Sequence, residues 1–165
     1  MKQQKLLRLV SEMLKNSKKS DRELAGILGV SQPTVSRTRA RIEKEYIKTY
    51  TIIPDFQKLG YQIMAFNFAK KNPCSEVTDF TKTLQKMKAW VAKRPNVIFA
   101  SDGEGFGKDL IIVSFHINYS AYAEFIRAFS IDLGASIDNY ESFLVSIGSP
   151  YTLREYDLKY LAEDI

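Results

Sequence analysis

The chain has 165 residues and a formal net charge of +5; 45% of its residues are hydrophobic and 26% are charged. This balance is typical of globular proteins and excludes a disordered chain, because enough apolar surface is present to offset the entropy of folding. The single cysteine, Cys74, and the single histidine, His116, exclude a disulfide framework and a multi-cysteine zinc site, so we expect neither metal nor cofactor. No run suits a membrane span or a signal peptide, and we therefore expect a cytoplasmic protein.

The positive charge is concentrated in the first third of the chain. Residues 1–50 contain 12 Lys and Arg against 5 Asp and Glu, whereas residues 51–165 contain 12 against 14. A basic segment joined to a near-neutral remainder is typical of a polyanion-binding module, but it also suits a plain solvated basic surface. The pattern of residues inside the segment has to separate these two interpretations.

Two helices are predicted before residue 30. Apolar residues recur at helical spacing over about residues 2–15 and predict an amphipathic helix. Ser20 stands three residues before Glu23, and this capping box predicts the start of a second helix. Gly29 is expected to end it, because glycine adopts the left-handed conformation of a helix C-terminus without steric cost.

A third helix is predicted over about residues 31–46. Ser31 suits its N-cap, and Pro33 lies in the first turn, where the missing N–H costs little. Val35 and Ile42 are seven residues apart and should face the core. A short helix, a turn with glycine and a third helix together have the spacing of a helix-turn-helix.

The outer side of this third helix is polar and basic. Gln and Arg can form paired hydrogen bonds with base edges, and Ser and Thr can donate to bases or phosphates. The competing interpretation is a surface helix that carries arginine for solubility. We consider DNA contact the better interpretation, and the candidate DNA-binding residues are Ser31, Gln32, Thr34, Ser36, Arg37, Arg39, Arg41 and Lys48.

The segment after the third helix is expected to lead out of this domain. Residues 47–53 are β-branched and aromatic, which predicts a strand, either a wing or the strand that leaves the domain. Pro54 begins a connecting segment that Gly60 closes. We therefore expect a winged helix-turn-helix domain over residues 1–53 and a linker over residues 54–60.

The rest of the chain predicts an α+β domain over residues 61–150. The expected elements are a strand over 61–69, a helix over about 76–92, strands over 97–101 and 110–118, a helix over about 119–133 and a strand over 136–147. The order β-α-β-β-α-β is the ferredoxin-like arrangement. We expect Cys74 in a polar loop and His116 as a packed strand residue. The tail, residues 151–165, has apolar residues among acids and suits a short docking helix.

Two helices on one face of a four-stranded sheet leave the other face uncovered. We expect Phe66, Phe68, Ile112 and Leu144 on that face. An exposed apolar patch of this kind marks an interaction site or an aggregation hazard. We therefore expect a homodimer or a higher homo-oligomer that forms through the sheet.

A glycine-rich segment joins the second and third predicted strands. Its alternate glycines indicate a tight loop, and it connects two strands, whereas a nucleotide-binding loop leads from a strand into a helix. Exposed N–H groups and carboxylates there could bind a zwitterion, although a purely structural hairpin is equally compatible. The candidate effector-binding residues are Ser101, Asp102, Gly103, Gly105, Gly107 and Asp109.

The layout of residues 2–148 resembles the leucine-responsive regulatory protein/AsnC (Lrp/AsnC) family of transcription regulators. The strongest part is LAGILGVSQPTVSRTRARIEKEYIKTYTIIPDFQKLGY, residues 24–61, which is similar to the family's DNA-reading segment. Residues 95–126 resemble its effector-binding and oligomerisation (RAM) domain. The resemblance implies a regulator that binds double-stranded DNA as a dimer or larger assembly, responds to a small molecule such as an amino acid, and is not an enzyme.

Two other functions are compatible with the same plan. Sirohaem decarboxylases share it, by resemblance, but need a tetrapyrrole pocket with His and Arg groups. This chain has only His116, and several of its arginines lie on the predicted DNA helix. In the second alternative, the basic domain binds a protein partner instead of DNA.

Overall fold

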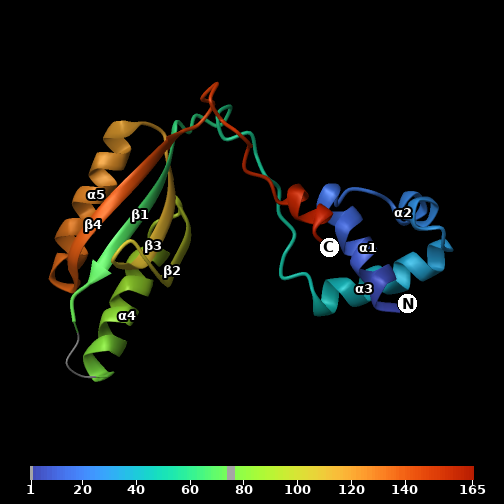
Figure 1. Ribbon diagram of the computed structural model, residues 1–165, viewed down its shortest axis with the longest axis horizontal. Helices are drawn as coiled ribbons and strands as arrows, with labels where there is room; N and C mark the ends of the chain where they lie inside the picture. The colour runs from blue at the N-terminus through green and yellow to red at the C-terminus, as the bar shows by residue number, and fades with distance from the viewer. Residues whose placement is uncertain (1, 74–76) are drawn as a thin grey trace. The chain divides into compact units, whose positions relative to one another are not determined.

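The helices of the first third and the strands that follow fall into two units of a mixed α+β chain (Figure 1). The computed structural model describes residues 2–73 and 77–165, so the expectation for Cys74 lies outside the described residues. Residues 1–53 group with residues 153–165, and we call this the helical unit. Residues 54–152 form the sheet unit.

The helical unit contains α1 (Lys2–Lys15), α2 (Asp21–Leu28) and α3 (Gln32–Glu45), which agree with the predicted helices to within a residue or two. The predicted capping box at Ser20 is confirmed, because its side chain accepts from the backbone N–H of the third helical residue while that residue's carboxylate reaches back. Gly29 ends α2 with φ 64°, in the left-handed region.

One apolar cluster holds the three helices together. Each helix contributes residues spaced three, four or seven apart, so that one side of each is apolar. The buried members are Leu6, Leu9, Met13, Leu24, Ala25, Val35 and Ile42. Because Val35 and Ile42 are among the most deeply buried, they fix the rotation of α3 about its axis and determine which of its residues face outward.

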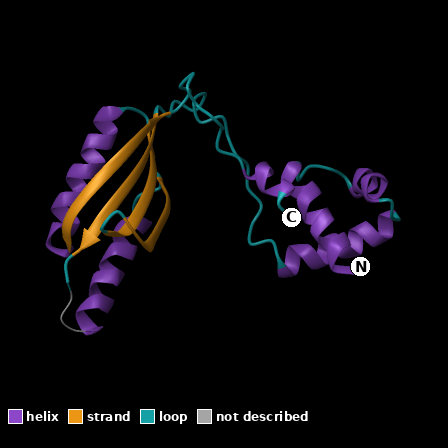
Figure 2. Cartoon of the chain, viewed as in Figure 1, coloured by secondary structure: helices purple, strands orange, loops and turns teal. Residues whose placement is uncertain are grey.

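The strand predicted over residues 47–53 is wrong, because this segment forms no regular secondary structure (Figure 2). β-Branched residues suit a pleated surface, but a strand also needs a neighbouring strand to pair with its N–H and C=O groups. The described residues of the helical unit contain no such strand. The wing that we expected is therefore not part of this unit.

The C-terminal segment returns to the helical unit and packs on α1. It contains a 3₁₀ helix, η2 (Leu158–Glu163), whose Ala162 is buried. The Ser11 hydroxyl of α1 donates to the Ala162 carbonyl at 2.7 Å, and Ser11 is itself buried. Ser11 lies about 200° around the helix from Leu9, which faces the three-helix cluster. The tail therefore covers the opposite side of α1.

The sheet unit has the predicted order β-α-β-β-α-β. Its elements are β1 (Ile63–Lys71), α4 (Val77–Ala92), β2 (Val97–Gly105), β3 (Lys108–His116), α5 (Tyr119–Leu133) and β4 (Ile137–Ser146), with a short 3₁₀ turn, η1 (Gly134–Ser136), before β4. The strands form one antiparallel sheet in the order β2-β3-β1-β4. Residues of α4 and α5 share one core cluster with β1 and β3, so both helices cover the same face.

The register of the sheet corrects two of the four residues that we expected on its uncovered face. Neighbouring residues of a strand point to opposite faces, and paired residues share a face. Ile112 is only 2% exposed and packs in the core cluster with α4 and α5. Leu144 pairs with Ala65, which is fully buried on the helix-covered face. Phe66 and Phe68 alternate with Ala65 and do lie on the uncovered face.

His116 is a packed strand residue, as predicted. It is 3% exposed, and its Nε2 lies 2.9 Å from the Ser114 hydroxyl. Its ring meets those of Tyr122 and Phe125 edge to face. Burial lowers the pKa of His116, so the imidazole is neutral at pH 7.

Candidate nucleic-acid interface

The outward side of α3 carries most of the candidate DNA-binding residues. Ser31 has the extended conformation of an N-cap, and its hydroxyl lies 2.8 Å from that of Thr34. The side chains of Gln32, Ser36 and Arg37 are exposed. Because Val35 is buried between them, the first two turns of α3 present a polar surface to solvent. This is the part of a recognition helix that enters the major groove in helix-turn-helix proteins.

Arg39 differs from the other arginines of α3, because it is engaged within the helical unit. Its Nε lies 2.7 Å from a carboxylate oxygen of Asp21, and its Nη2 donates to the Lys19 carbonyl at 2.7 Å. The side chain is only 18% exposed. Arg39 thus joins α3 to the beginning of α2, and its charge is balanced inside the protein. As a DNA contact, Arg39 stays a prediction.

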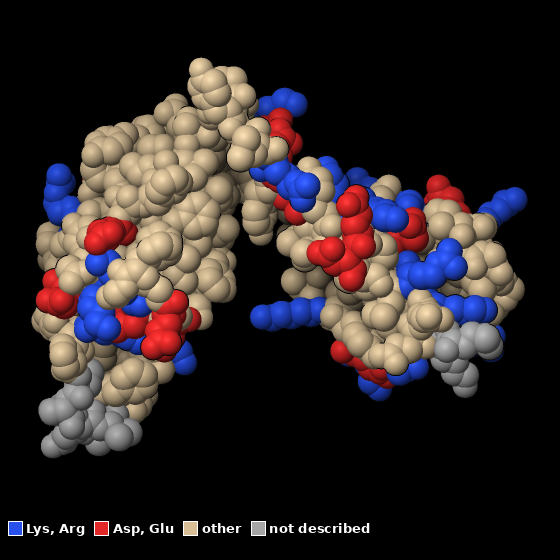
Figure 3. Space-filling view, in the orientation of Figure 1, with Lys and Arg blue, Asp and Glu red and all other residues tan. Residues whose placement is uncertain are grey.

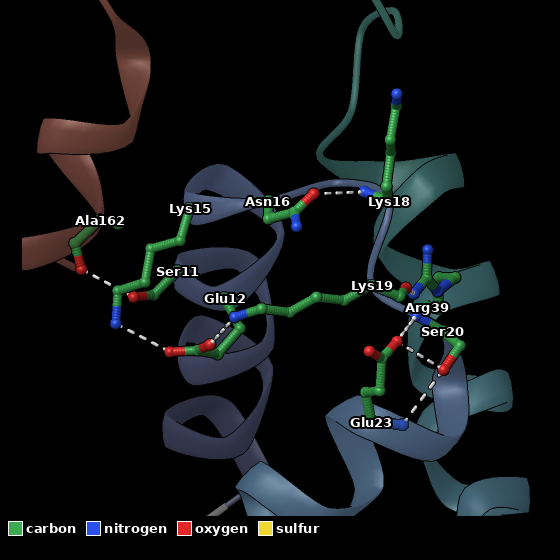
Figure 4. A network of polar contacts seen from close by, with 10 residues as sticks. All are labelled: Ser11, Glu12, Lys15, Asn16, Lys18, Lys19, Ser20, Glu23, Arg39 and Ala162. Carbon is green, nitrogen blue, oxygen red and sulfur yellow. Dashed lines mark hydrogen bonds and ion pairs between the residues drawn. The ribbon is translucent and has the colours of Figure 1, made fainter.

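Arg39 belongs to a larger polar network on this side of the unit (Figure 4). Glu12 of α1 binds Lys15 at 2.8 Å and Lys19 at 2.6 Å. Side-chain hydrogen bonds from both lysines lower the pKa of Glu12. The figure also draws the capping box and the contact between Ser11 and Ala162. We call this set of balanced charges and hydrogen bonds the network side.

A groove of about 280 Å³ lies between α1 and α3. Its cations come from both helices: Lys5 and Arg8 from α1, and Arg37 and Arg41 from α3. The other residues that line it are Leu6, Leu9, Leu28, Val30, Thr34, Val35 and Thr38. The structure therefore brings together Thr34, Arg37 and Arg41, three of the candidate residues. We call this the groove side.

Sequence reasoning missed Lys5 and Arg8 as members of this groove. They stand three residues apart on α1 and therefore share one face of the helix, which was the available signal. Only tertiary packing places that face beside α3. Figure 3 shows acidic side chains among the basic ones on the visible face of the helical unit, so the positive excess is local rather than uniform.

Lys48 lies beyond α3, in the segment without regular structure. Its side chain is exposed, and no ion pair joins it to the described residues. Arg41, by contrast, pairs with Glu45 one turn along α3 at 2.9 Å. Both members of that pair are largely exposed, so the interaction is weak and leaves Arg41 able to change partner.

The candidate effector-binding segment is mostly strand rather than loop. β2 continues through Gly105, and β3 begins at Lys108, so only Phe106 and Gly107 form the turn. Their φ angles are 53° and 69°, the two positive values of a type I′ hairpin. The expected loop was too long, because alternate glycines need not interrupt a strand. Ser101, Asp102 and Gly103 lie within β2 and are exposed.

Both candidate carboxylates are engaged by lysines of β1. Asp102 lies 2.8 Å from the Lys71 ammonium. Asp109 accepts the Lys71 backbone N–H at 2.9 Å and pairs with Lys70 at 3.1 Å. Burial alone would raise the pKa of Asp109, but this backbone hydrogen bond and the contact with Lys70 hold it below its usual value. An ammonium ligand would therefore compete with two lysines for these oxygens.

The described residues contain neither a candidate metal site nor a candidate membrane-spanning helix. In residues 2–73 and 77–165, no three His, Cys, Asp or Glu side chains are grouped so that they could hold a metal ion. None of the helices in the described part of the chain is both long and apolar enough to cross a bilayer.

Comparison with known sequences finds relatives among helix-turn-helix regulators, whereas no family model matches the chain. The HTH-type transcriptional regulator PH0061 of Pyrococcus horikoshii is 33% identical over 89 residues, which cover 48% of this chain and 60% of the relative. The regulator PYRAB00690 of Pyrococcus abyssi is 38% identical over 72 residues, 43% of this chain and 48% of the relative. The chain thus matches about half of the length of these two relatives.

Solved structures with a similar fold cover nearly the whole chain. The crystal structure of PH0061 has a TM-score of 0.70 at 23% identity and covers 93% of this chain and 95% of its own. The regulator NMB0573 from Neisseria meningitidis was solved as a complex with L-Met. It has a TM-score of 0.72 at 15% identity, and the match covers 90% of this chain and 92% of the relative. An AsnC family regulator from Agrobacterium tumefaciens has a TM-score of 0.71 at 18% identity and covers 96% of both chains. These likenesses establish a shared fold.

Proposed function

Since the chain has the fold of AsnC/Lrp family regulators and part of its sequence is similar to HTH-type transcriptional regulators, we propose that it is a sequence-specific DNA-binding transcription regulator of this type, and not an enzyme. The observation that carries the proposal is the pair α2 and α3. A left-handed Gly29 joins them, and Val35 and Ile42 anchor α3 so that its polar side faces solvent.

In the proposed complex, α3 lies in the major groove of double-stranded DNA. Gln32 and Arg37 read base edges through paired hydrogen bonds, while Ser31, Thr34 and Ser36 donate to bases or phosphates. Arg41 and Lys48 neutralise phosphates, which positions the protein without reading sequence. Arg39 acts indirectly, since its ion pair with Asp21 sets the angle between α2 and α3.

We assign DNA binding to residues 1–53 together with the returning tail, and assembly to the ferredoxin-like sheet unit. The support is the uncovered sheet face, where Phe143 is 65% exposed beside Phe66, and Phe99, which pairs with Val113, is 52% exposed. Pairing of two such faces gives a symmetric homodimer with two DNA-binding units. Their half-sites would lie about 34–36 Å apart, or a multiple of this distance, on one face of the duplex.

We further propose that the β2–β3 hairpin binds a small effector such as an amino acid. The complex of the Neisseria relative with L-Met supports the ligand class. The exposed Gly103, Gly105 and Gly107 leave backbone groups accessible, and Asp102 and Asp109 can exchange their lysine partners for an ammonium. A thermal-shift screen of the amino acids tests this, and stabilisation by none of them contradicts it.

The central experiment selects fragmented genomic DNA with the purified protein. We expect enrichment of fragments that share a palindromic sequence, because a symmetric dimer reads two half-sites. Mobility shifts of these fragments at about 50 and about 200 mM salt should show weaker binding at the higher concentration, because each phosphate contact releases counterions. Selection of no common sequence over competitor DNA contradicts the proposal and favours a protein partner.

A further inference from the structure

The groove side of the helical unit has a chemical character that α3 alone does not explain. Lys5 and Arg8 lie one turn apart on α1, and Arg37 and Arg41 lie one turn apart on α3. All four line the same groove of about 280 Å³. Its floor is apolar, because the lining includes edges of the residues that form the core, among them Leu9.

Three of the four cations around this groove have no acidic partner among the described residues. Among the described residues, no ion pair joins Lys5, Arg8 or Arg37, and only Arg41 has a partner, Glu45. On the network side, by contrast, Lys and Arg side chains are paired with carboxylates, so the same helical unit does neutralise cations elsewhere. Convergent like charges repel one another unless an anion lies between them, and a concave basic surface attracts polyanions strongly.

The dimensions of the duplex place one strand over this groove. A recognition helix occupies the major groove, which is about 12 Å wide, so a sugar–phosphate strand runs roughly 6 Å to either side of its axis. Packed helices lie about 8–10 Å apart, so a strand beside α3 passes above the space between α3 and α1. Arg37 and Arg41 line that space on the α3 side.

We infer that the groove between α1 and α3 seats one sugar–phosphate strand of the bound DNA, with Lys5 and Arg8 as phosphate contacts. This rests on the proposed function, because α3 has to occupy the major groove. The ammonium and guanidinium groups donate to phosphate oxygens, and the apolar floor contacts the deoxyribose between them. Such contacts fix the register of α3 on the duplex and are independent of sequence.

The test is the double variant Lys5→Gln/Arg8→Gln, assayed on a fragment that the wild-type protein selects. Loss of two phosphate contacts should reduce the slope of log affinity against log salt by about 1.8. For the variant, the ratio of the affinity at about 50 mM salt to that at about 200 mM salt should therefore be about tenfold smaller than for wild type. Both residues are exposed, so the unfolding midpoint should stay unchanged.

A matched control removes two charges from the sheet unit instead. Lys86→Gln/Lys88→Gln changes the net charge equally, and both lysines are exposed on α4. This variant should keep the wild-type slope. The swap Lys5→Arg/Arg8→Lys retains two cations in the groove and should also keep it. A lower slope in the sheet-unit variant would show that net charge alone acts, which overturns the inference.

Footprinting separates this inference from the proposed function. Hydroxyl-radical cleavage reports exposure of the sugars, and methylation protection reports contact with guanine in the major groove. Lys5→Gln/Arg8→Gln should lose sugar protection on one strand and keep guanine protection. If the variant keeps both the sugar protection and the salt slope of wild type, the inference is overturned. An acidic protein is then the better candidate to bind the groove. If wild-type protein gives no footprint, the proposed function itself fails.

Discussion

The two sides of the helical unit contain the same kinds of residue but use them differently. On the network side, Arg39 is paired with Asp21, and Glu12 holds two lysines. On the groove side, only Arg41 of the four cations forms an ion pair with the described residues, and its partner, Glu45, is exposed. A charge balanced by its own chain stabilises the fold, whereas an unbalanced charge beside a concave surface is available to a ligand. Position relative to acids thus separates arginines that are paired within the fold from arginines that are open to a ligand.

Ile42→Ala should have the largest effect, because it removes the residue on which both sides depend. Ile42 is fully buried between the helices, and its truncation should cost about 2–5 kcal/mol of unfolding free energy. DNA binding and the network should be lost together. Urea denaturation of the helical unit measures the cost. Ile52→Ala, at a largely exposed isoleucine, is the matched control and should have little effect.

Arg37→Ala and Arg39→Ala should separate the two sides most directly. Arg37→Ala should weaken specific binding by about 1–3 kcal/mol and relax base preference. Its unfolding free energy should stay within about 0.5 kcal/mol of wild type, because the side chain is exposed. Arg39→Ala should instead lower the unfolding free energy by about 1–2 kcal/mol, since Asp21 and the Lys19 carbonyl lose a charged partner.

These two variants are compared by mobility shift at a temperature where both are folded. Arg39→Ala should bind with an almost unchanged preference for sequence once the folded fraction is taken into account. If Arg39→Ala relaxes base preference while stability is unchanged, the two sides do not differ in the way proposed, and Arg39 is a direct DNA contact.

The sequence predicted what depends on local spacing. Ser20 with Glu23 and the left-handed Gly29 are local signals, and they placed α2 to the residue. Contacts between distant residues could not be predicted in this way. The pair of Arg39 with Asp21 and the approach of Lys5 to α3 depend on how the helices pack, which periodicity leaves open.

The errors in the sheet unit have a similar origin. Apolar character predicted that Ile112 would be in a strand, but its neighbours are equally apolar, so the pattern did not show which face it occupies. Only the pairing of the strands placed it in the core. The tail was expected to form a short docking helix, but its place of docking on α1 could not be predicted, since Ser11 meets Ala162 across 151 positions of sequence.

Ser11→Ala should test whether the tail is part of the network side. The hydroxyl is buried and makes one hydrogen bond, so its removal should lower the unfolding free energy by about 1 kcal/mol. Ser17→Ala is the matched control, because Ser17 is exposed. Amide exchange should quicken in residues 158–163 of the variant. Equal stability of the two variants would show that the tail contact contributes nothing.

The smallest expected effect is the pH dependence of Glu12. Its lysine partners lower the pKa of Glu12 in the folded protein below the ordinary value for a glutamate, about 4.5. The carboxylate therefore adds stability that is fully present above about pH 4.5 and is lost as pH falls through the lowered folded pKa. For a pair close to the surface, this contribution is on the order of 0.5 kcal/mol.

Glu12→Gln isolates this contribution, because glutamine keeps the shape and removes the titration. The variant should be less stable than wild type at pH 7, and the difference should disappear as pH falls below the lowered folded pKa of Glu12, where the carboxyl is protonated in both states. Chemical denaturation at several pH values measures the difference. If the unfolding free energies of wild type and Glu12→Gln differ by the same amount at every pH, Lys15 and Lys19 do not hold Glu12 in solution. The network side would then be balanced by solvent rather than by its own charges, and the contrast with the groove side would be weaker.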